Sequence, residues 1–157
     1  MEVVKQRMAR VVVDSNVLIA ARLSNDQDHD RGRSISRAID RNELPTAYVP
    51  SNVFEEVLNY LQTRAGHDIA IETLDALVES GGYELSYTPK ADFNAGRSIF
   101  RTYDGLSLTD AIIVATMQRQ DVEYLYSFDD DFDAVEGITG TTARLVGRSE
   151  ADGHHSV

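Results

Sequence analysis

Three consecutive valines, Val11 to Val13, are followed directly by an aspartate, Asp14. A short run of β-branched apolar residues is typical of a strand that is buried on both faces of a parallel sheet. Open α/β proteins place their sites at the edge where such strands end. The sequence therefore predicts a carboxylate at that edge, followed by a helix that Ser15 and Asn16 cap and that runs to about Leu23.

Helices and strands alternate along the rest of the chain. Apolar periodicity and turn residues predict helices over about 32–42, 51–65, 68–79, 89–103 and 111–118. Short apolar runs predict further strands over 45–49, 83–88, 122–128 and 142–146. This alternation predicts an α/β fold, a three-layer α/β/α sandwich around a mainly parallel sheet of about five strands.

Two helix starts and one helix face are predicted in detail. Ser51 is expected to cap its helix, and Ser107 with Asp110 has the form of a capping box. In the helix over 68–79 the inward side chains are expected to be Ile69, Ile71, Leu74, Leu77 and Val78.

The length of 157 residues is that of one domain, with a core over about 10–146 and a solvated tail over 147–157. No apolar run is long enough to span a bilayer, and the N-terminus lacks a signal-peptide pattern. The absence of cysteine excludes disulfides and thiolate metal sites. We therefore expect a cytoplasmic protein without a membrane association.

The formal net charge of −11 argues against a nucleic-acid partner, because phosphate binding draws on a positive surface. The objection weakens if some of the acidic residues bind divalent cations, since these cancel charge where a substrate docks. Whether a nucleic acid could bind therefore depends on whether the acidic residues are arranged to bind cations.

Acidic residues stand at several predicted element ends. Asp14 and Asp129 follow strands, Asp110 lies in a first helical turn, and Glu56, or its neighbour Glu55, lies in a second turn. In a parallel sheet these ends share one edge, where clustered carboxylates repel each other unless a cation compensates. Oxygen ligands without cysteine or a suitably placed histidine favour Mg²⁺ or Mn²⁺.

Each acid also has a purely structural interpretation. Asp110 could serve only as a cap, Glu56 could be a surface residue, and the run Asp129 to Asp133 could be a solvated loop. Strands that end on an acid, as at Asp14, also occur at structural turns. The functional hypothesis therefore depends on the combination and order of the four.

Arginines repeat at helical spacing over 33–41. Their side chains share one helix face and could contact RNA phosphates, the residues being Arg33, Arg37 and Arg41. They could equally pair with the neighbouring Asp30, Asp40 and Glu43. Arg97 and Arg101 form a similar pair with the same two interpretations.

Four segments of the chain resemble the PIN domain, the ribonuclease fold of VapC-type toxins and of RNA-processing nucleases. The segments are Val12 to Ile19, Ser51 to Leu58, Leu106 to Ile113 and Leu125 to Phe132. Each is short, but their order and spacing extend over about residues 10 to 146.

The resemblance implies roles for individual residues. The four acids of the family fall on Asp14, Glu56, Asp110 and Asp129, with Glu56 preferred to Glu55 because an aliphatic residue follows it. Asp131 matches a further acid that would bind metal directly or through water. Supporting polar residues would be Ser15 and Ser127, where threonine is frequent in the family, together with Asn16.

The resemblance also implies an activity. We expect an Mg²⁺- or Mn²⁺-dependent endoribonuclease, the toxin of a type II toxin–antitoxin pair, that binds a cognate antitoxin and forms a homodimer. A housekeeping RNA-processing nuclease and an inactive PIN-like binding module are the alternatives within the family. Two alternatives lie outside the family. A haloacid dehalogenase-type phosphatase would need a second aspartate two residues after Asp14, where this chain has Asn16. A receiver-like signalling module would need paired acids after the first strand, which this chain lacks.

Overall fold

A computed structural model describes residues 10–140 of the chain. Five strands form one sheet in which every neighbouring pair is parallel, in the order β3-β2-β1-β4-β5. The strands are β1 (Arg10–Val13), β2 (Thr46–Pro50), β3 (Tyr83–Ser86), β4 (Tyr124–Tyr126) and β5 (Thr139–Gly140). The helices are α2 (Ser15–Arg22), α3 (His29–Asp40), α4 (Ser51–Ala65), α5 (His67–Glu79), α6 (Lys90–Thr102) and α7 (Leu108–Gln120), with a 3₁₀ turn η1 (Asp131–Ala134).

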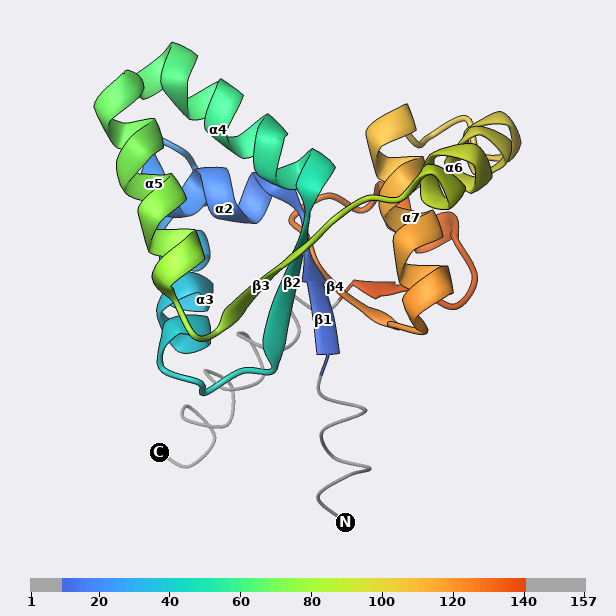
Figure 1. Cartoon of the computed structure of the whole chain (residues 1–157), viewed down its shortest axis with the longest axis horizontal. Coiled ribbons are helices and arrows are strands. Elements are labelled where there is room, and N and C mark those ends of the chain that lie inside the picture. The colour runs from blue at the N-terminus through green and yellow to red at the C-terminus, as the bar shows by residue number, and fades with distance from the viewer. Residues whose placement is uncertain (1–9, 141–157) are drawn as a thin grey trace.

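The helices cover the sheet on both sides (Figure 1). Helices α2 to α5 lie on one side, and α6 and α7 form a hairpin on the other. The expected three-layer α/β fold with a five-stranded sheet is confirmed, and the sheet is wholly parallel.

The path of the chain explains this division. It runs outward from β1 through β2 to β3, then crosses back over the sheet and places β4 on the other side of β1. Right-handed crossovers that step in opposite directions along a sheet put their helices on opposite faces. The strand order therefore reverses between β1 and β4, which is where open α/β sheets form their binding crevice.

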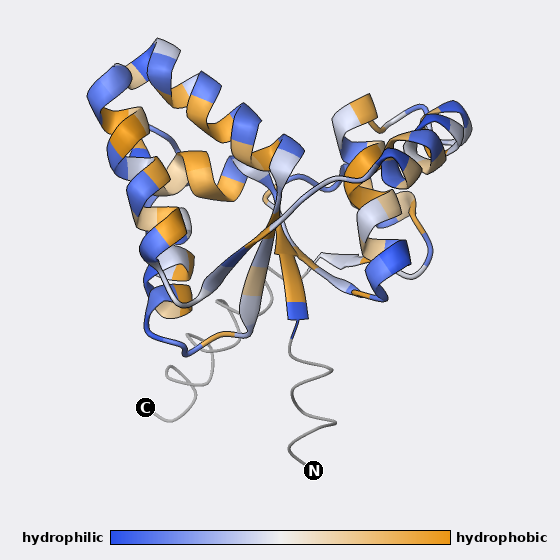
Figure 2. Ribbon diagram, in the orientation of Figure 1, coloured by the Kyte–Doolittle hydropathy of each residue, from blue (hydrophilic) through white to orange (hydrophobic). Residues whose placement is uncertain are grey.

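The centre of the core is the strand that the valine run predicted. Val11, Val12 and Val13 are at most 1% exposed, and apolar positions face inward from both helical layers (Figure 2). Burial of one such side chain stabilises the fold by about 1.5–3 kcal/mol. Burial thus stabilises the strand that leads into Asp14.

Several predicted boundaries move. Helix α3 begins at His29 rather than Gly32, and β3 and β4 are shorter than the apolar runs that predicted them. The strand expected over 142–146 lies outside the described residues, as do the lead-in over 1–9 and the tail over 147–157. The last described strand is β5, at Thr139–Gly140.

Two predicted caps are wrong and one is confirmed. Asp14, not Ser15 or Asn16, caps α2, because its carboxylate accepts the backbone N–H of Ser15. Ser51 is already helical, and its hydroxyl instead accepts the backbone N–H of Thr88 at 2.9 Å. The capping box of Ser107 with Asp110 is present in both directions.

The predicted inward face of α5 is confirmed at Leu77, leaves Ile69 half-buried, and is wrong at the other three positions. The buried residues are Ala70, Thr73 and Leu77, whereas Ile71, Leu74 and Val78 are exposed. Small side chains at positions 70 and 73 let α5 pack closely, and the Thr73 hydroxyl is satisfied by donating to the Ile69 carbonyl at 2.8 Å. Close packing of α5 therefore decides which of its side chains are buried, and the larger apolar residues remain on the exposed side.

Candidate functional site

Asp14 lies at the reversal of strand order between β1 and β4. Val13 pairs with Tyr126 in the parallel ladder, and the Asp14 backbone N–H donates to the Tyr126 carbonyl at 2.9 Å. This register places the residues that follow the two strands side by side. The Asp14 side chain is 5% exposed, so its carboxylate is buried at the C-terminal edge of the sheet.

Polar groups from both strand ends hold the Asp14 carboxylate. Oδ1 accepts the Ser15 N–H at 2.8 Å, and Oδ2 accepts the Ser127 hydroxyl at 2.9 Å. Asn16 links the same groups, since its amide donates to Ser127 Oγ at 3.2 Å and its Oδ1 accepts the Phe128 N–H at 3.2 Å. The three residues expected to support the site, Ser15, Asn16 and Ser127, thus surround Asp14.

Three further carboxylates gather beside this centre. Asp110, Asp129 and Asp131 each offer an oxygen that lies within 4.8 Å of the other two. Asp110 comes from the first turn of α7, and the other two come from the loop after β4, where the Asp131 N–H donates to Asp129 Oδ1 at 3.0 Å. Ser127 anchors this loop because its hydroxyl also accepts the Asp129 N–H at 3.1 Å.

Glu56 approaches the same edge from the second turn of α4. Its Oε1 accepts the Ser15 hydroxyl at 3.0 Å, and its charge acts on Asp14. Glu55, the other candidate, is exposed like Glu56, but it has no hydrogen bond of this kind within residues 10–140. The geometry therefore favours Glu56 as the member of the site.

The acids shift each other's titration. Burial raises the pKa of Asp14 from 3.8 to about 7, with the charges of Asp110 and Glu56 adding to it and the Ser127 and Ser15 hydrogen bonds opposing it. Burial, together with Asp129 and Asp131, raises the pKa of Asp110 against the hydrogen bonds from Ser107. The hydrogen bond and charge of Asp129 raise the pKa of Asp131. The raised pKa values show that no nearby cationic side chain in the described part of the chain compensates the carboxylates at this edge of the sheet.

The donor set fits a hard divalent cation. The clustered ligand atoms are all carboxylate oxygens, and within residues 10–140 the group contains neither histidine nor cysteine. Such a set suits Mg²⁺ or Mn²⁺ better than Zn²⁺. A cation placed here would lower the repulsion that raises the pKa values of these acids.

The arginines at 33, 37 and 41 do not join the acids. Arg33 and Arg37 are exposed on α3, and Arg41, also exposed, directly follows this helix in the connection to β2. No ion pair with Asp30, Asp40 or Glu43 forms in the part of the chain that the structure describes. Their outer face therefore offers no contact to the site in this structure.

A different arginine of the same helix is close to the site. The Arg31 guanidinium lies 4.5 Å from the centre of the Phe128 ring and pairs with Asp28 at 3.2 Å. Phe128 stands between Ser127 and Asp129, so Arg31 braces the loop that carries the acids. No pattern in the sequence could indicate this contact, since it joins positions that are remote along the chain.

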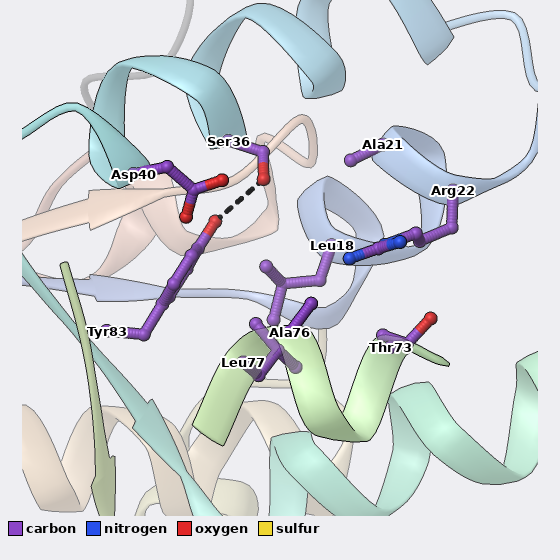
Figure 3. Close-up of a pocket in the computed structure, with 9 residues that line it drawn as sticks. All are labelled: Leu18, Ala21, Arg22, Ser36, Asp40, Thr73, Ala76, Leu77 and Tyr83. Atoms are coloured by element: carbon purple, nitrogen blue, oxygen red, sulfur yellow. Dashed lines mark hydrogen bonds between the residues drawn. The ribbon is translucent and has the colours of Figure 1, made fainter. Parts of the chain in front are cut away.

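A small polar cavity lies away from the acids, between α2, α3, α5 and β3 (Figure 3). The Tyr83 hydroxyl donates to Ser36 Oγ at 3.0 Å, and burial raises the pKa of Tyr83 to about 12. The cavity volume is about 20 Å³, which holds about one water molecule. It cannot admit a nucleotide and does not compete with the acidic edge as a substrate site.

The PIN domain family matches the chain over residues 11–138. The chain belongs to the PIN domain family. This membership excludes the phosphatase and receiver families as alternatives. A search of curated proteins gave no match.

Solved structures share the PIN fold with this chain. VapC20 of Mycobacterium tuberculosis, a toxin that cleaves the sarcin-ricin loop, has a TM-score of 0.69 at 20% identity, over 80% of this chain and 95% of that one. VapBC2 of Rickettsia felis, bound to a promoter DNA fragment, has a TM-score of 0.63 at 11% identity, over 82% and 95%. A toxin–antitoxin complex of Klebsiella pneumoniae has a TM-score of 0.60 at 19% identity, over 82% and 95%.

None of the helices in residues 10–140 combines the length and apolar character that crossing a membrane requires.

Proposed function

We propose that this PIN domain is a divalent metal-dependent endoribonuclease. The observation that carries the proposal is the meeting of Asp110, Asp129 and Asp131 within 4.8 Å, beside the buried Asp14, at the reversal of strand order. Clustered carboxylates at that edge of a PIN fold are suited to phosphodiester hydrolysis with Mg²⁺ or Mn²⁺.

Each residue has a role in this proposal. Asp14, Asp110 and Asp129, with Asp131, would hold the cation, which when bound supplies positive charge against the charge developing on the phosphodiester. Ser127 would fix the Asp14 carboxylate by donating to it, and Asn16 would hold Ser127 in place and donate a longer hydrogen bond of 3.5 Å to Asp14 Oδ2. Glu56, oriented by Ser15, would position the water whose oxygen attacks phosphorus as the bond to the leaving sugar oxygen breaks.

The test is RNA cleavage with a matched pair of variants. Asp129→Asn removes a carboxylate of the cluster, whereas Asp130→Asn removes the neighbouring exposed charge, which is not in the cluster. We expect Mg²⁺-dependent cleavage that EDTA stops, a loss of about 100-fold or more in Asp129→Asn, and near-normal rates in Asp130→Asn. Cleavage that persists in Asp129→Asn, or that ignores EDTA, would contradict the proposal.

The biological setting that we propose is a type II toxin–antitoxin pair. The solved structures of similar fold include a toxin and two toxin–antitoxin assemblies, which supports an antitoxin partner and an RNA target. A homodimer is part of the same expectation. Retention of all four acids at one edge argues against an inactive binding module.

A growth assay separates a toxin from a housekeeping nuclease. Induced expression of the wild-type chain should arrest growth, Asp129→Asn should not, and co-expression of the product of a short neighbouring gene should restore growth. An active nuclease whose expression leaves growth unaffected would instead indicate a housekeeping RNA-processing enzyme.

A further inference from the structure

Helix α6 exposes cationic and aromatic side chains on one face. The spacing of three, four and seven residues puts these positions on the same side of the helix: Lys90, Phe93, Arg97, Phe100 and Arg101. All five are exposed, and the two phenylalanines are 46% and 47% accessible. We refer to these five residues as the α6 face.

The α6 face is positive in a protein whose net charge is −11. The only acid of α6, Asp92, is 2% exposed and faces α7. Its carboxylate accepts hydrogen bonds from Arg119 Nε at 2.7 Å and from the Thr116 hydroxyl at 2.8 Å. None of the three cations of the α6 face forms an ion pair with any residue in 10–140. The cations therefore remain available to an anionic partner.

The α6 face lies next to the end of α7 that carries Asp110. Gly96 sits against Ile112, so closely that a Cβ at position 96 would lie 2.7 Å from Ile112 Cγ1. The connection between the helices is only five residues, 103–107, and makes them antiparallel neighbours. Phe100 and Arg101, one turn beyond Gly96, therefore lie on the part of α6 that runs beside the first turn of α7, which carries Asp110.

We propose that the α6 face binds single-stranded RNA and leads it to the acidic cluster. This inference rests on the proposed ribonuclease function. Exposed aromatic rings that alternate with cations match the alternation of bases and phosphates in a single strand. The cations also offset the repulsion between the strand and the acidic surface.

A second copy of this chain fits the face less well. A two-fold contact of α6 against α6 would bring Arg97 and Arg101 toward the same arginines of the partner, without acids on the helix surface to compensate. The two phenylalanines are also two helical turns apart with Arg97 between them, so they form no continuous apolar patch.

The experiment measures binding of a labelled, unstructured oligoribonucleotide in EDTA, and then its cleavage in Mg²⁺. The first variant, Phe93→Leu with Phe100→Leu, keeps the apolar bulk and removes the flat rings. The second, Arg97→Gln with Arg101→Gln, removes the charges. The matched control, Arg33→Gln with Arg37→Gln, removes the same charge from the outer face of α3.

The leucine variant should bind RNA about ten-fold more weakly or worse. The glutamine variant should reduce the slope of log affinity against log salt by about 1.4, or about 0.7 for each phosphate contact. In both variants the KM for RNA cleavage should rise while kcat at saturating RNA is retained. The α3 control should behave as wild type. Circular dichroism would verify that each variant is folded.

Other outcomes are decisive as well. If the wild-type chain cleaves RNA and the α6 variants keep the wild-type affinity, salt slope and KM, the inference is overturned and the proposed function stands. If the wild type binds RNA through the α6 face but never cleaves it, the proposed function fails and the inference stands. If the variants change only the oligomeric state, the face is a contact between copies and the inference is wrong.

Discussion

At the scale of single residues, Asp14 couples stability to pH. Its pKa is 3.8 in an unfolded chain and about 7 in the folded one, so the folded state binds the proton more tightly. The stabilisation from the protonated form is complete below about pH 4 and is lost as the pH rises through about 7. We expect this loss to be about 4 kcal/mol at most in metal-free protein.

The check is the free energy of urea unfolding of wild type minus that of Asp14→Asn, measured in EDTA across this pH range. Asparagine has nearly the same shape and does not titrate, so the subtraction isolates Asp14. The difference should fall with rising pH and level off above about pH 8. A difference that is flat, or that rises, would show that the carboxyl is not held in the buried environment described here.

Glu55 and Glu56 offer a second test at this scale, because they are adjacent and chemically identical. Only Glu56 accepts a hydrogen bond from Ser15 and acts on Asp14. We expect Glu56→Gln to slow RNA cleavage by about ten-fold or more, with Glu55→Gln close to wild type. Steady-state rates at saturating Mg²⁺ measure both, and a reversed order would move the site residue to Glu55.

The sequence was sufficient to locate the acids but not their supporting contacts. Asp14 and Asp129 end buried strands and Asp110 opens a helix, so topology alone brings them to one edge. The double role of Ser127, which donates to Asp14 and accepts from the Asp129 N–H, depends on side-chain distances that no spacing encodes. The stacking of Arg31 on Phe128 is unpredictable for the same reason.

At the scale of elements, the contact of α6 with α7 depends on a glycine. A Cβ at Gly96 would lie 3.0 Å from the Ile112 Cα, a backbone atom that cannot move away alone. Gly96→Ala should therefore force the helices apart and lower the free energy of unfolding by about 1–3 kcal/mol. Urea denaturation measures the change.

The control for this substitution is Gly105→Ala in the nearby turn, where an added Cβ has no neighbour within 4 Å among the described residues. It should change stability by less than about 0.5 kcal/mol. Equal stability of the two variants would mean that the helices are less closely packed than described.

The errors at the element scale have a common physical cause. Ser51 was expected to cap α4 from residue type alone, but its hydroxyl bonds to Thr88, which lies 37 positions later. The inward face of α5 was assigned to its largest apolar residues, yet close packing selected Ala70 and Thr73. Local pattern therefore identified each helix, and tertiary contacts decided which atoms it buries.

At the scale of the whole molecule, the fold separates a cluster of acidic side chains from a surface of cationic ones. A chain of net charge −11 places five carboxylates where its strand order reverses, and three exposed cations on the neighbouring α6. The alternation of strands and helices was enough to predict the parallel sheet and its covering layers. It could not indicate that the α6 cations, rather than those of α3, adjoin the α7 end of the acidic edge.

The central claim is that this edge binds a divalent cation, and calorimetric titration of Mn²⁺ into the metal-free protein tests it most directly. The wild type should bind Mn²⁺ with a saturable heat, and Asp129→Asn should bind at least about ten-fold more weakly, because a cluster carboxylate is missing. Asp130→Asn should match the wild type. Equal Mn²⁺ binding by wild type and Asp129→Asn, or no saturable binding by either, would contradict the account.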